Sequence, residues 1–151
     1  MALFLVQHGL SLSKEKDPEK GLSNAGKEDT RRIADVAKSY AIVVAKIVHS
    51  GKKRAAQTGI IFQDVLQPKS NIAEISGINP MDDVKAFGDT IDPAADLMVV
   101  GHLPFMEKLV SYLTAGLKDK RVYKFQNSGI VCLDREDNDW FIKWTLNPNI
   151  S

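Results

Sequence analysis

Residues 3–9 read Leu-Phe-Leu-Val-Gln-His-Gly, an apolar run of strand formers that ends in a polar residue, a histidine and a glycine. In open α/β sheets, ligands bind outside the carboxyl ends of the parallel strands. His8 would lie at such an end, and Gly9 would let the backbone turn sharply behind it. On this stretch alone, a plain N-terminal strand whose histidine caps the sheet is the better explanation, so the rest of the chain has to decide.

Composition and charge exclude several classes of protein. The 151 residues are 44% hydrophobic and 26% charged, which predicts one soluble globular domain over residues 1–151. The net charge of +1 provides no overall field for nucleic acid or a membrane surface, so neither is an expected partner. The apolar start is too short for a signal peptide and lacks a basic segment, and no run is long enough to cross a bilayer. A cytoplasmic location is therefore expected.

No metal site is expected. Cys132 is the only cysteine, which excludes an intrachain disulfide and any multi-cysteine metal site. It is most simply a small buried apolar residue. His8, His49 and His102 are far apart in the sequence and lack the spacing of metal ligands. We therefore expect neither a metal nor another cofactor.

Helical and strand patterns alternate along the chain, which predicts a parallel sheet covered on both faces. Ser23 is a suitable N-cap for the first helix. The predicted fold class is α/β, a three-layer α/β/α sandwich with a mostly parallel central sheet and an antiparallel C-terminal strand pair. Helices are predicted over residues 24–39, 52–66 and 81–87 and from Pro104 to a stop at Gly116. Strands are predicted over residues 42–48, 71–75, 96–100, 129–133 and 140–146. Residues 134–139 are predicted to form a polar connection between the last two strands.

The start of the second predicted helix carries a charge pattern that stability does not explain. Lys52, Lys53 and Arg54 lie in its first turn, although the positive end of the helix dipole favours acidic residues there. Cations and free amide groups at a strand-to-helix junction are typical of a site for an anion such as phosphate. The strand over residues 96–100 repeats the opening pattern, because a glycine and His102 follow it. Two histidines and an arginine would thus meet at the carboxyl edge of the sheet.

Four segments resemble motifs of one family. Residues 6–9, Val-Gln-His-Gly, resemble the Arg-His-Gly signature of the histidine phosphatase (phosphoglycerate mutase-like) superfamily, and residues 22–26, Leu-Ser-Asn-Ala-Gly, resemble its Leu-Thr-x-x-Gly segment. Residues 54–58, Arg-Ala-Ala-Gln-Thr, resemble its Arg-Ala-x-Gln-Thr, and residues 100–104, Val-Gly-His-Leu-Pro, its second-histidine motif. The short chain, the His-Leu-Pro variant and the small central region are most similar to the bacterial SixA-type phosphohistidine phosphatases.

The resemblance implies a role for each matching residue. His8 would be the nucleophile that accepts the phosphoryl group as a phosphohistidine intermediate. Arg54 would hold the phosphoryl oxygens, and His102 would donate to an equatorial oxygen. Residues 127–129 would add one more polar contact, whereas His49 is interpreted as a structural histidine. The expected catalytic residues are His8, Arg54 and His102, and the expected phosphate-binding residues are Gln7, Gly9, Ser50, Arg54 and His102.

Two departures from the family pattern bear on activity. Gln7 stands where the family has arginine, and an amide offers no charge and no bidentate fork. Losing a charged hydrogen bond of about 1.5–3 kcal/mol would slow the reaction by about tenfold to a few hundredfold, although Lys52 or Lys53 would compensate in part. The acid that relatives cleaving alkyl phosphates place after the central strand is also missing, because Asp82 and Asp83 are interpreted as first-turn helix residues. An imidazole leaving group needs less protonation than an alkoxide, so this absence favours a phosphohistidine substrate.

Three hypotheses for function remain. The first is a metal-independent phosphatase that removes phosphoryl groups from protein phosphohistidine through His8, with a phosphohistidine-carrying domain as its partner. The second is a phosphatase for a small phosphorylated metabolite; the short sequence between residues 71 and 96 leaves little room for a substrate-covering insertion and argues against it. The third is a pseudophosphatase that binds phosphoryl groups without turnover, which Gln7 suggests. The chain is expected to be a monomer or a weak dimer.

Overall fold

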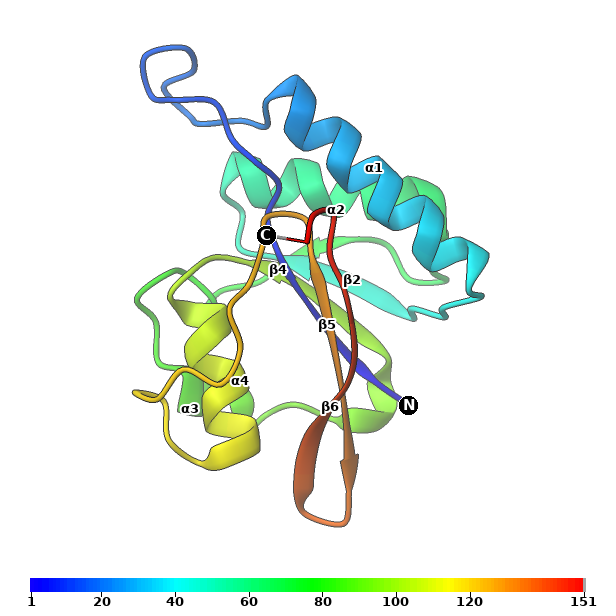
Figure 1. Cartoon of the computed structure of the whole chain (residues 1–151), viewed down its shortest axis with the longest axis vertical. Helices are drawn as coiled ribbons and strands as arrows, with labels where there is room; N and C mark the ends of the chain where they lie inside the picture. Colours follow the sequence, from blue (N-terminus) through cyan, green and yellow to red (C-terminus); the bar gives the residue numbers. More distant parts are fainter. Residues whose placement is uncertain (151) are drawn as a thin grey trace.

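The computed structural model describes residues 1–150, which form a six-stranded sheet with helices on both faces (Figure 1). The strand order is β3-β2-β4-β1-β5-β6. The first four strands of the chain are parallel to one another, β5 is antiparallel to β1, and β6 is antiparallel to β5. The strands are β1 (Leu3–Gln7), β2 (Lys46–His49), β3 (Ala73–Glu74), β4 (Leu97–Gly101), β5 (Ile130–Glu136) and β6 (Asp139–Leu146).

The helices form one layer on each side of the sheet. α1 (Asn24–Ser39) and α2 (Lys53–Leu66) cover one face, and α3 (Val84–Gly88) and α4 (Phe105–Ala115) cover the other (Figure 1). A short 3-10 helix, η1 (Pro93–Ala95), precedes β4. Within residues 1–150, no helix is long and apolar enough to span a bilayer. The predicted α/β/α sandwich with an antiparallel C-terminal strand pair is confirmed.

β1 lies inside the sheet and is buried on both faces. Phe4 and Val6 pack into the core shared with α1 and α2, whereas Leu3 and Leu5 pack into the core shared with α3 and α4. None of these four side chains is more than 3% exposed. Burial on both faces explains why the strand is a continuous apolar run rather than an alternating one. Cys132 is buried in the first of these cores, as predicted, and burial raises the pKa of its thiol to about 11.

The second strand is shorter than the sequence predicts. β2 covers Lys46–His49, so the prediction of a strand over residues 42–48 is wrong for its first half. Ala41 has a φ of 57° just after α1, and the chain then needs residues 42–45 to reach the sheet. Val44 is nevertheless only 5% exposed, so the apolar pattern reflects a connecting segment packed on the core.

Other boundaries differ by a few residues. α1 and its Ser23 cap are confirmed, since the Ser23 side chain accepts from Gly26 N–H. α3 begins at Val84 instead of residue 81 because the Asp83 side chain caps it, and β3 has only two of the predicted residues 71–75. α2 and α4 each begin one residue after the predicted start, and β4 runs one residue later than the predicted strand.

The final hairpin is tighter than predicted. The sequence predicts a connection over residues 134–139, but β5 continues to Glu136 and β6 begins at Asp139. Only Asp137 and Asn138 turn the chain, and Asp137 has a φ of 54°, which aspartate and asparagine tolerate better than most residues. The polar residues of this segment therefore lie mainly on exposed strand ends rather than in a loop.

The carboxyl ends of β1, β2 and β4 lie level with one another at one edge of the sheet. Gln7 at the end of β1 pairs with Gly101 of β4, and His49 of β2 pairs with Val100. The residues that follow these three strands are therefore brought together. They are His8, Ser50 and His102.

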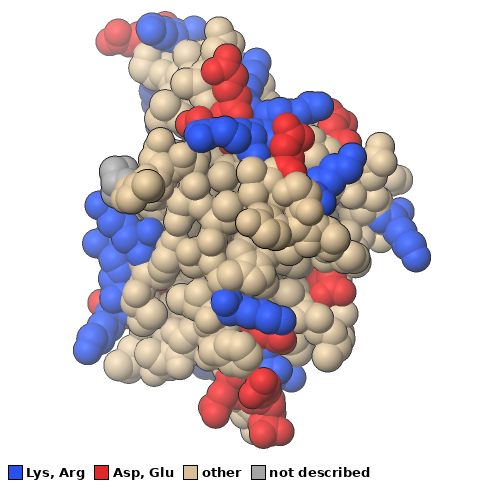
Figure 2. All heavy atoms as spheres, turned by 45° about the vertical axis from the view of Figure 1, so that its right-hand side comes forward, with Lys and Arg blue, Asp and Glu red and all other residues tan. Residues whose placement is uncertain are grey.

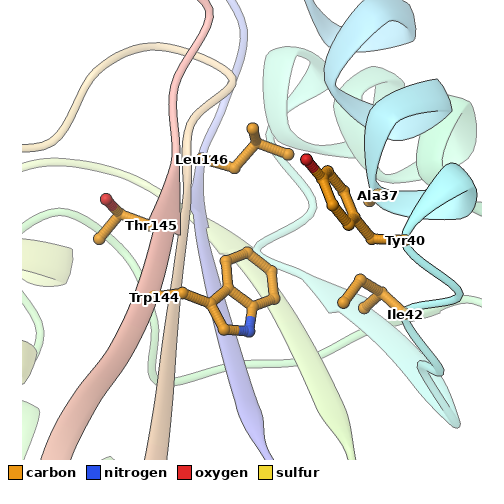
Figure 3. Close-up of a pocket in the computed structure, with 6 residues that line it drawn as sticks. All are labelled: Ala37, Tyr40, Ile42, Trp144, Thr145 and Leu146. Carbon is orange, nitrogen blue, oxygen red and sulfur yellow. The ribbon is translucent and has the colours of Figure 1, made fainter.

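An apolar hollow of about 390 Å³ lies between the end of α1 and β6. Figure 3 shows the rings of Tyr40 and Trp144 on opposite sides of it. None of its lining residues is a predicted site residue, so the candidate site is a separate place at the carboxyl edge. The hollow is lined by Ala37, Tyr40, Ile42, Trp144, Thr145 and Leu146.

Gly26 lets α1 pack closely against the chain that follows β1. A Cβ on this residue would overlap the carbonyl oxygen of Leu10. That oxygen is fixed, because the backbone N–H of Ser23 donates to it at 2.9 Å and the Ser23 hydroxyl at 3.1 Å. This contact gives a physical reason for the glycine that ends the Leu-Ser-Asn-Ala-Gly segment.

We predict that Gly26→Ala lowers the free energy of unfolding by about 2 kcal/mol or more, because a fixed backbone oxygen has to move. Gly59→Ala in α2 is the matched control, since its Cβ would meet the movable end of the Ile72 side chain. The gain in helix propensity of about 1 kcal/mol should keep that variant within about 1 kcal/mol of the parent. Urea unfolding of both variants is the measurement, and equal stabilities would contradict the prediction.

Candidate active site

The structure brings His8, Arg54, Ser50 and His102 together at the carboxyl edge of the sheet. The His8 backbone N–H donates to Gly101 O at 3.0 Å, which continues the ladder of β1 by one residue. The His8 carbonyl accepts from the Asn127 side-chain amide at 2.9 Å. Both backbone groups of His8 are thus engaged, so the position of its side chain follows from the sheet itself.

One hydrogen bond fixes the tautomer of His8. Its Nδ1 lies 2.7 Å from the carbonyl oxygen of Gly9. A carbonyl only accepts, so Nδ1 must carry the proton and Nε2 is left with its lone pair. Arg54 Nε donates to this Nε2 at 3.3 Å. The imidazole nitrogen with nucleophilic character therefore faces the guanidinium.

His102 forms the other wall of the site. It is 1% exposed, and its ring centroid lies 5.1 Å from that of His8, with the two rings tilted by 50°. Its Nε2 is 2.6 Å from Ser50 Oγ, so Ser50 contacts the second histidine directly. His102 Nδ1 is buried and has no hydrogen-bond partner among the described residues.

Helix α2 positions more of the site than Arg54 alone. The Thr58 hydroxyl accepts from Gly9 N–H at 2.8 Å and donates to the Arg54 carbonyl at 2.8 Å. The Gln57 side chain accepts from Leu22 N–H at 2.6 Å. The last two residues of the Arg-Ala-Ala-Gln-Thr segment thus tie this helix to both other loops of the site. Sequence analysis matched these residues to a motif but gave them no role; their spacing from Arg54 was the available signal.

Gly9 and Gln7 occupy the two ends of the turn after β1. A Cβ on Gly9 would lie 2.8 Å from Thr30 Oγ1 and 3.1 Å from Ser128 Oγ, so close packing requires glycine here. Because its N–H already binds Thr58, its predicted contact with phosphate stays a prediction. The Oε1 atom of Gln7 is buried and has no hydrogen-bond partner among residues 1–150.

Three predicted polar residues lie in other surroundings. Asp82 accepts from Asn79 N–H at 2.8 Å, and Asp83 accepts from Lys85 N–H at 2.9 Å. Both carboxylates therefore stabilise the local backbone. His49 Nδ1 accepts from Gly51 N–H at 3.0 Å, and burial lowers its pKa. Among the residues described, no group of three His, Cys, Asp or Glu side chains is placed to hold a metal ion.

Charge is unevenly distributed along the molecule. Residues 10–21 and 50–54, which surround the site, contain six Lys or Arg and three Asp or Glu. Residues 134–139, at the tip of the β5–β6 hairpin, contain four Asp or Glu and one Arg. Figure 2 shows this acidic group at the end of the molecule away from the loops that follow β1. An anion would therefore be attracted to the site end although the net charge is only +1.

No protein-family model matches the chain, and no curated protein matches it. Solved structures do match it. The protein histidine phosphatase SixA complexed with tungstate superposes with a TM-score of 0.85 at 22% identity, over 98% of this chain and 97% of the other. The chain has the histidine phosphatase fold.

Two further neighbours show the breadth of this fold. A protein assigned as phosphohistidine phosphatase SixA from Agrobacterium tumefaciens has a TM-score of 0.78 and 25% identity, over 98% of both chains. Phosphoserine phosphatase from Entamoeba histolytica has a TM-score of 0.71 and 12% identity, over 95% of both chains. The histidine phosphatase fold thus occurs with protein and small-molecule substrates, and the substrate class has to be argued from the site.

Both site histidines of this histidine phosphatase fold are neutral at pH 7. Burial is the main cause that lowers the pKa of His8 to about 4; the Gly9 carbonyl opposes the shift, and Arg54 and Lys20 add to it. The pKa of His102 is lowered to about 3, first by burial and then by the positive charges around it. A neutral His8 keeps its Nε2 lone pair available at neutral pH.

We predict that stability rises with pH between about 4 and 6.5, because the unfolded chain then binds more protons than the folded one. Each histidine contributes a slope of at most about 1.4 kcal/mol per pH unit in this window, and the gain is complete above the unfolded pKa of about 6.5. Urea unfolding at several pH values measures the slope, and His8→Asn should reduce it. NMR titration of His8 and His102 near the ordinary value of about 6.5 would contradict the prediction.

Proposed function

We propose that this protein is a phosphatase that removes phosphoryl groups from protein phosphohistidine through a phosphohistidine intermediate on His8. The observation that carries the proposal is the hydrogen bond from His8 Nδ1 to the Gly9 carbonyl, which leaves Nε2 unprotonated and facing Arg54 Nε. Phosphoryl transfer depends chiefly on positioning and on stabilising charge. A fixed neutral imidazole next to a guanidinium supplies both.

In the proposed reaction, the His8 Nε2 lone pair attacks phosphorus while the bond from phosphorus to the substrate imidazole breaks. His8 keeps its Nδ1 proton and becomes a phosphorylated imidazolium, whose positive charge the Gly9 carbonyl stabilises. If the substrate ring also carries a proton on the nitrogen that is not bonded to phosphorus, it leaves as neutral imidazole. The exchange is then symmetric and needs no added acid. Water then attacks phosphorus, its protons pass to phosphate and solvent, and neutral His8 is restored.

The surrounding groups stabilise the transferring phosphoryl group. The Arg54 guanidinium is planar and presents several donors, which suits the oxygens of a phosphoryl group. His102 would donate to an equatorial oxygen, and Ser50 holds it in orientation through the 2.6 Å contact with Nε2. A related fold binds tungstate, a tetrahedral oxyanion of the same shape as phosphate. No step in this scheme uses a metal ion, and we propose a cytoplasmic protein that acts as a monomer or weak dimer.

The placement of the nearby carboxylates bears on the choice of substrate. Asp82 and Asp83 accept backbone hydrogen bonds, and Glu74 at the end of β3 lies beside Gly51. Among the described residues, no carboxylate is hydrogen-bonded to His8 or His102. General acid catalysis typically contributes about 10²–10⁴ in rate, and an alkoxide leaving group depends on it. An imidazole leaving group does not, so the lack of a carboxylate bonded to either histidine favours phosphohistidine over an alkyl phosphate.

Gln7 favours a second candidate, a protein that binds phosphoryl groups without turning them over. A glutamine stands where the family has arginine, and its Oε1 is buried without a partner in the described chain. An amide stabilises a transition-state charge less than a guanidinium does. Experiment has to separate the two candidates, and the following labelling test does so.

We predict that a phosphohistidine-carrying domain transfers acid-labile phosphate to His8, detected by rapid quenching and peptide mapping. His8→Ala should abolish the label, and His49→Ala is the matched control that should retain it. An alkyl phosphate should react with a kcat/KM at least about a hundredfold lower, because no carboxylate of the described residues is hydrogen-bonded to His8 or His102 to act as a general acid. A chain that binds inorganic phosphate but never becomes labelled would support the binding protein instead.

We further predict that Gln7→Arg raises turnover by at least about tenfold, since it restores one charged hydrogen bond to the phosphoryl group. The effect should fall mainly on kcat, because the arginine would stabilise the transferring phosphoryl group more strongly in the transition state than in the bound substrate. Gln67→Arg, at the end of α2 and outside the site, is the control for an added charge. An unchanged rate in Gln7→Arg would mean that another group already supplies the missing charge.

A further inference from the structure

The positive charge in contact with His8 is smaller than the negative charge of the proposed phosphoryl ligand. A phosphoryl group carries about −1.5 to −2 charge at neutral pH. Of the described residues, Arg54 alone places a cationic group in hydrogen-bond contact with His8. Gln7 contributes no charge. A second cation close to His8 would therefore bring the positive charge of the site closer to the negative charge of the phosphoryl group. The neighbouring lysines are the candidates for this cation.

The two lysines at the start of α2 are poorly placed to supply it. Lys53 Nζ lies 2.8 Å from Asp17 Oδ2 and 3.8 Å from Glu19 Oε2, so its charge is already paired. The hydrogen bond with Asp17 raises the pKa of Lys53 accordingly. Lys52 is exposed at the N-cap of the helix. Its charge acts on His102 and is not among those that lower the pKa of His8.

Asp17 gives the loop over residues 10–21 a fixed shape. Its carboxylate accepts from Gly21 N–H at 2.9 Å and from Glu19 N–H at 3.1 Å, in addition to Lys53. The two arms of the loop also pair with each other, because Leu12 N–H donates to Gly21 O at 2.8 Å. The returning arm is fastened to α2 as well, through the bond from Leu22 N–H to Gln57 described above. The loop thus returns beside the helix that carries Arg54.

Lys20 lies on this returning arm, two residues before Leu22, whose side chain would lie 3.1 Å from a Cβ on Gly9. It has a φ of 54°, in the left-handed region that lysine rarely adopts, and its N–H donates to Asp17 O at 2.9 Å. The side chain is half-buried, and among the described residues it has no hydrogen-bonded or ion-pair partner. Strained backbone is retained where the surrounding structure enforces it, often at functional sites. Its charge is also one of those that lower the pKa of His8.

We propose that Lys20 is a phosphoryl-binding residue of this site and supplies the positive charge that Gln7 does not. The proposal rests on the proposed function, since it takes the His8 pocket as the place where the phosphoryl group binds. An ammonium group has three rotatable donors and acts as a point charge, so it can reach an oxygen that the Arg54 fork leaves free. Asp17 accepts from the Lys53 ammonium with its side chain but from Lys20 only through the backbone, so the Lys20 ammonium is left without an ion pair among the described residues.

Anion binding tests this role without requiring turnover. The dissociation constants of inorganic phosphate and tungstate are measured by calorimetry for the whole chain. Lys20→Met should weaken both by about tenfold, as expected for the loss of one charged hydrogen bond. Lys20→Arg should retain binding, because the charge remains. Lys16→Met removes an exposed lysine of the same loop and should change either constant by less than about twofold.

A double-mutant cycle tests the link with Gln7. In a Gln7→Arg background, Lys20→Met should weaken anion binding by a smaller factor, because the introduced arginine also binds the anion. Unchanged anion binding in Lys20→Met, or an equal loss in Lys16→Met, would overturn the role of Lys20. If Lys20→Met weakens anion binding equally with and without Gln7→Arg, Lys20 does not compensate for the charge that Gln7 lacks. Thermal unfolding of each variant shows whether it is folded, and absence of label on His8 would contradict the proposed turnover alone.

Discussion

The hydrogen bond from Gly9 N–H to the Thr58 hydroxyl, at 2.8 Å, is the contact on which the arrangement of the site depends. It ties the turn after β1 to the helix that carries Arg54, and the same hydroxyl donates back to the Arg54 carbonyl. A main-chain group and a short side chain leave few rotatable bonds between His8 and the Arg54 guanidinium. Their relative position is therefore set by packing of the backbone and needs little ordering when a ligand arrives.

Much of this arrangement could be predicted from the sequence, because it depends on repeated local patterns. An apolar strand followed by a polar tip and a glycine located His8 and His102, and the unusual cations at the start of α2 located Arg54. The boundaries that failed depend on tertiary structure: Ile42 and Val44 pack on the core without joining the sheet, and residues 134–136 are polar although they pair in the sheet. The role of Thr58 and the one proposed for Lys20 depend on contacts across the fold, and the spacing of Thr58 from Arg54 was the only local signal for either.

Gln7 shows how a fold can be retained while its chemistry is adjusted. Gln7 lies at the end of a buried strand, in register with Gly101 of β4, and the backbone N–H of His8 donates to Gly101 O. The charge at the site depends on the side chain of residue 7, whereas the position of His8 depends on the backbone. Such a separation lets the electrostatic strength of the site vary independently of its geometry, and the loop over residues 10–21 is the part of the chain best able to respond.

The place of β1 between β4 and β5 also has a consequence for how the protein is made. Leu3 pairs with Leu97 on one side and with Leu133 on the other, so its partners are translated long after it. Such distant pairing slows folding and leaves an apolar segment exposed in the meantime. During synthesis, the strand that carries His8 must wait for most of the chain to emerge from the ribosome. His8 is therefore translated before much of its surroundings, including Arg54, His102 and Asn127.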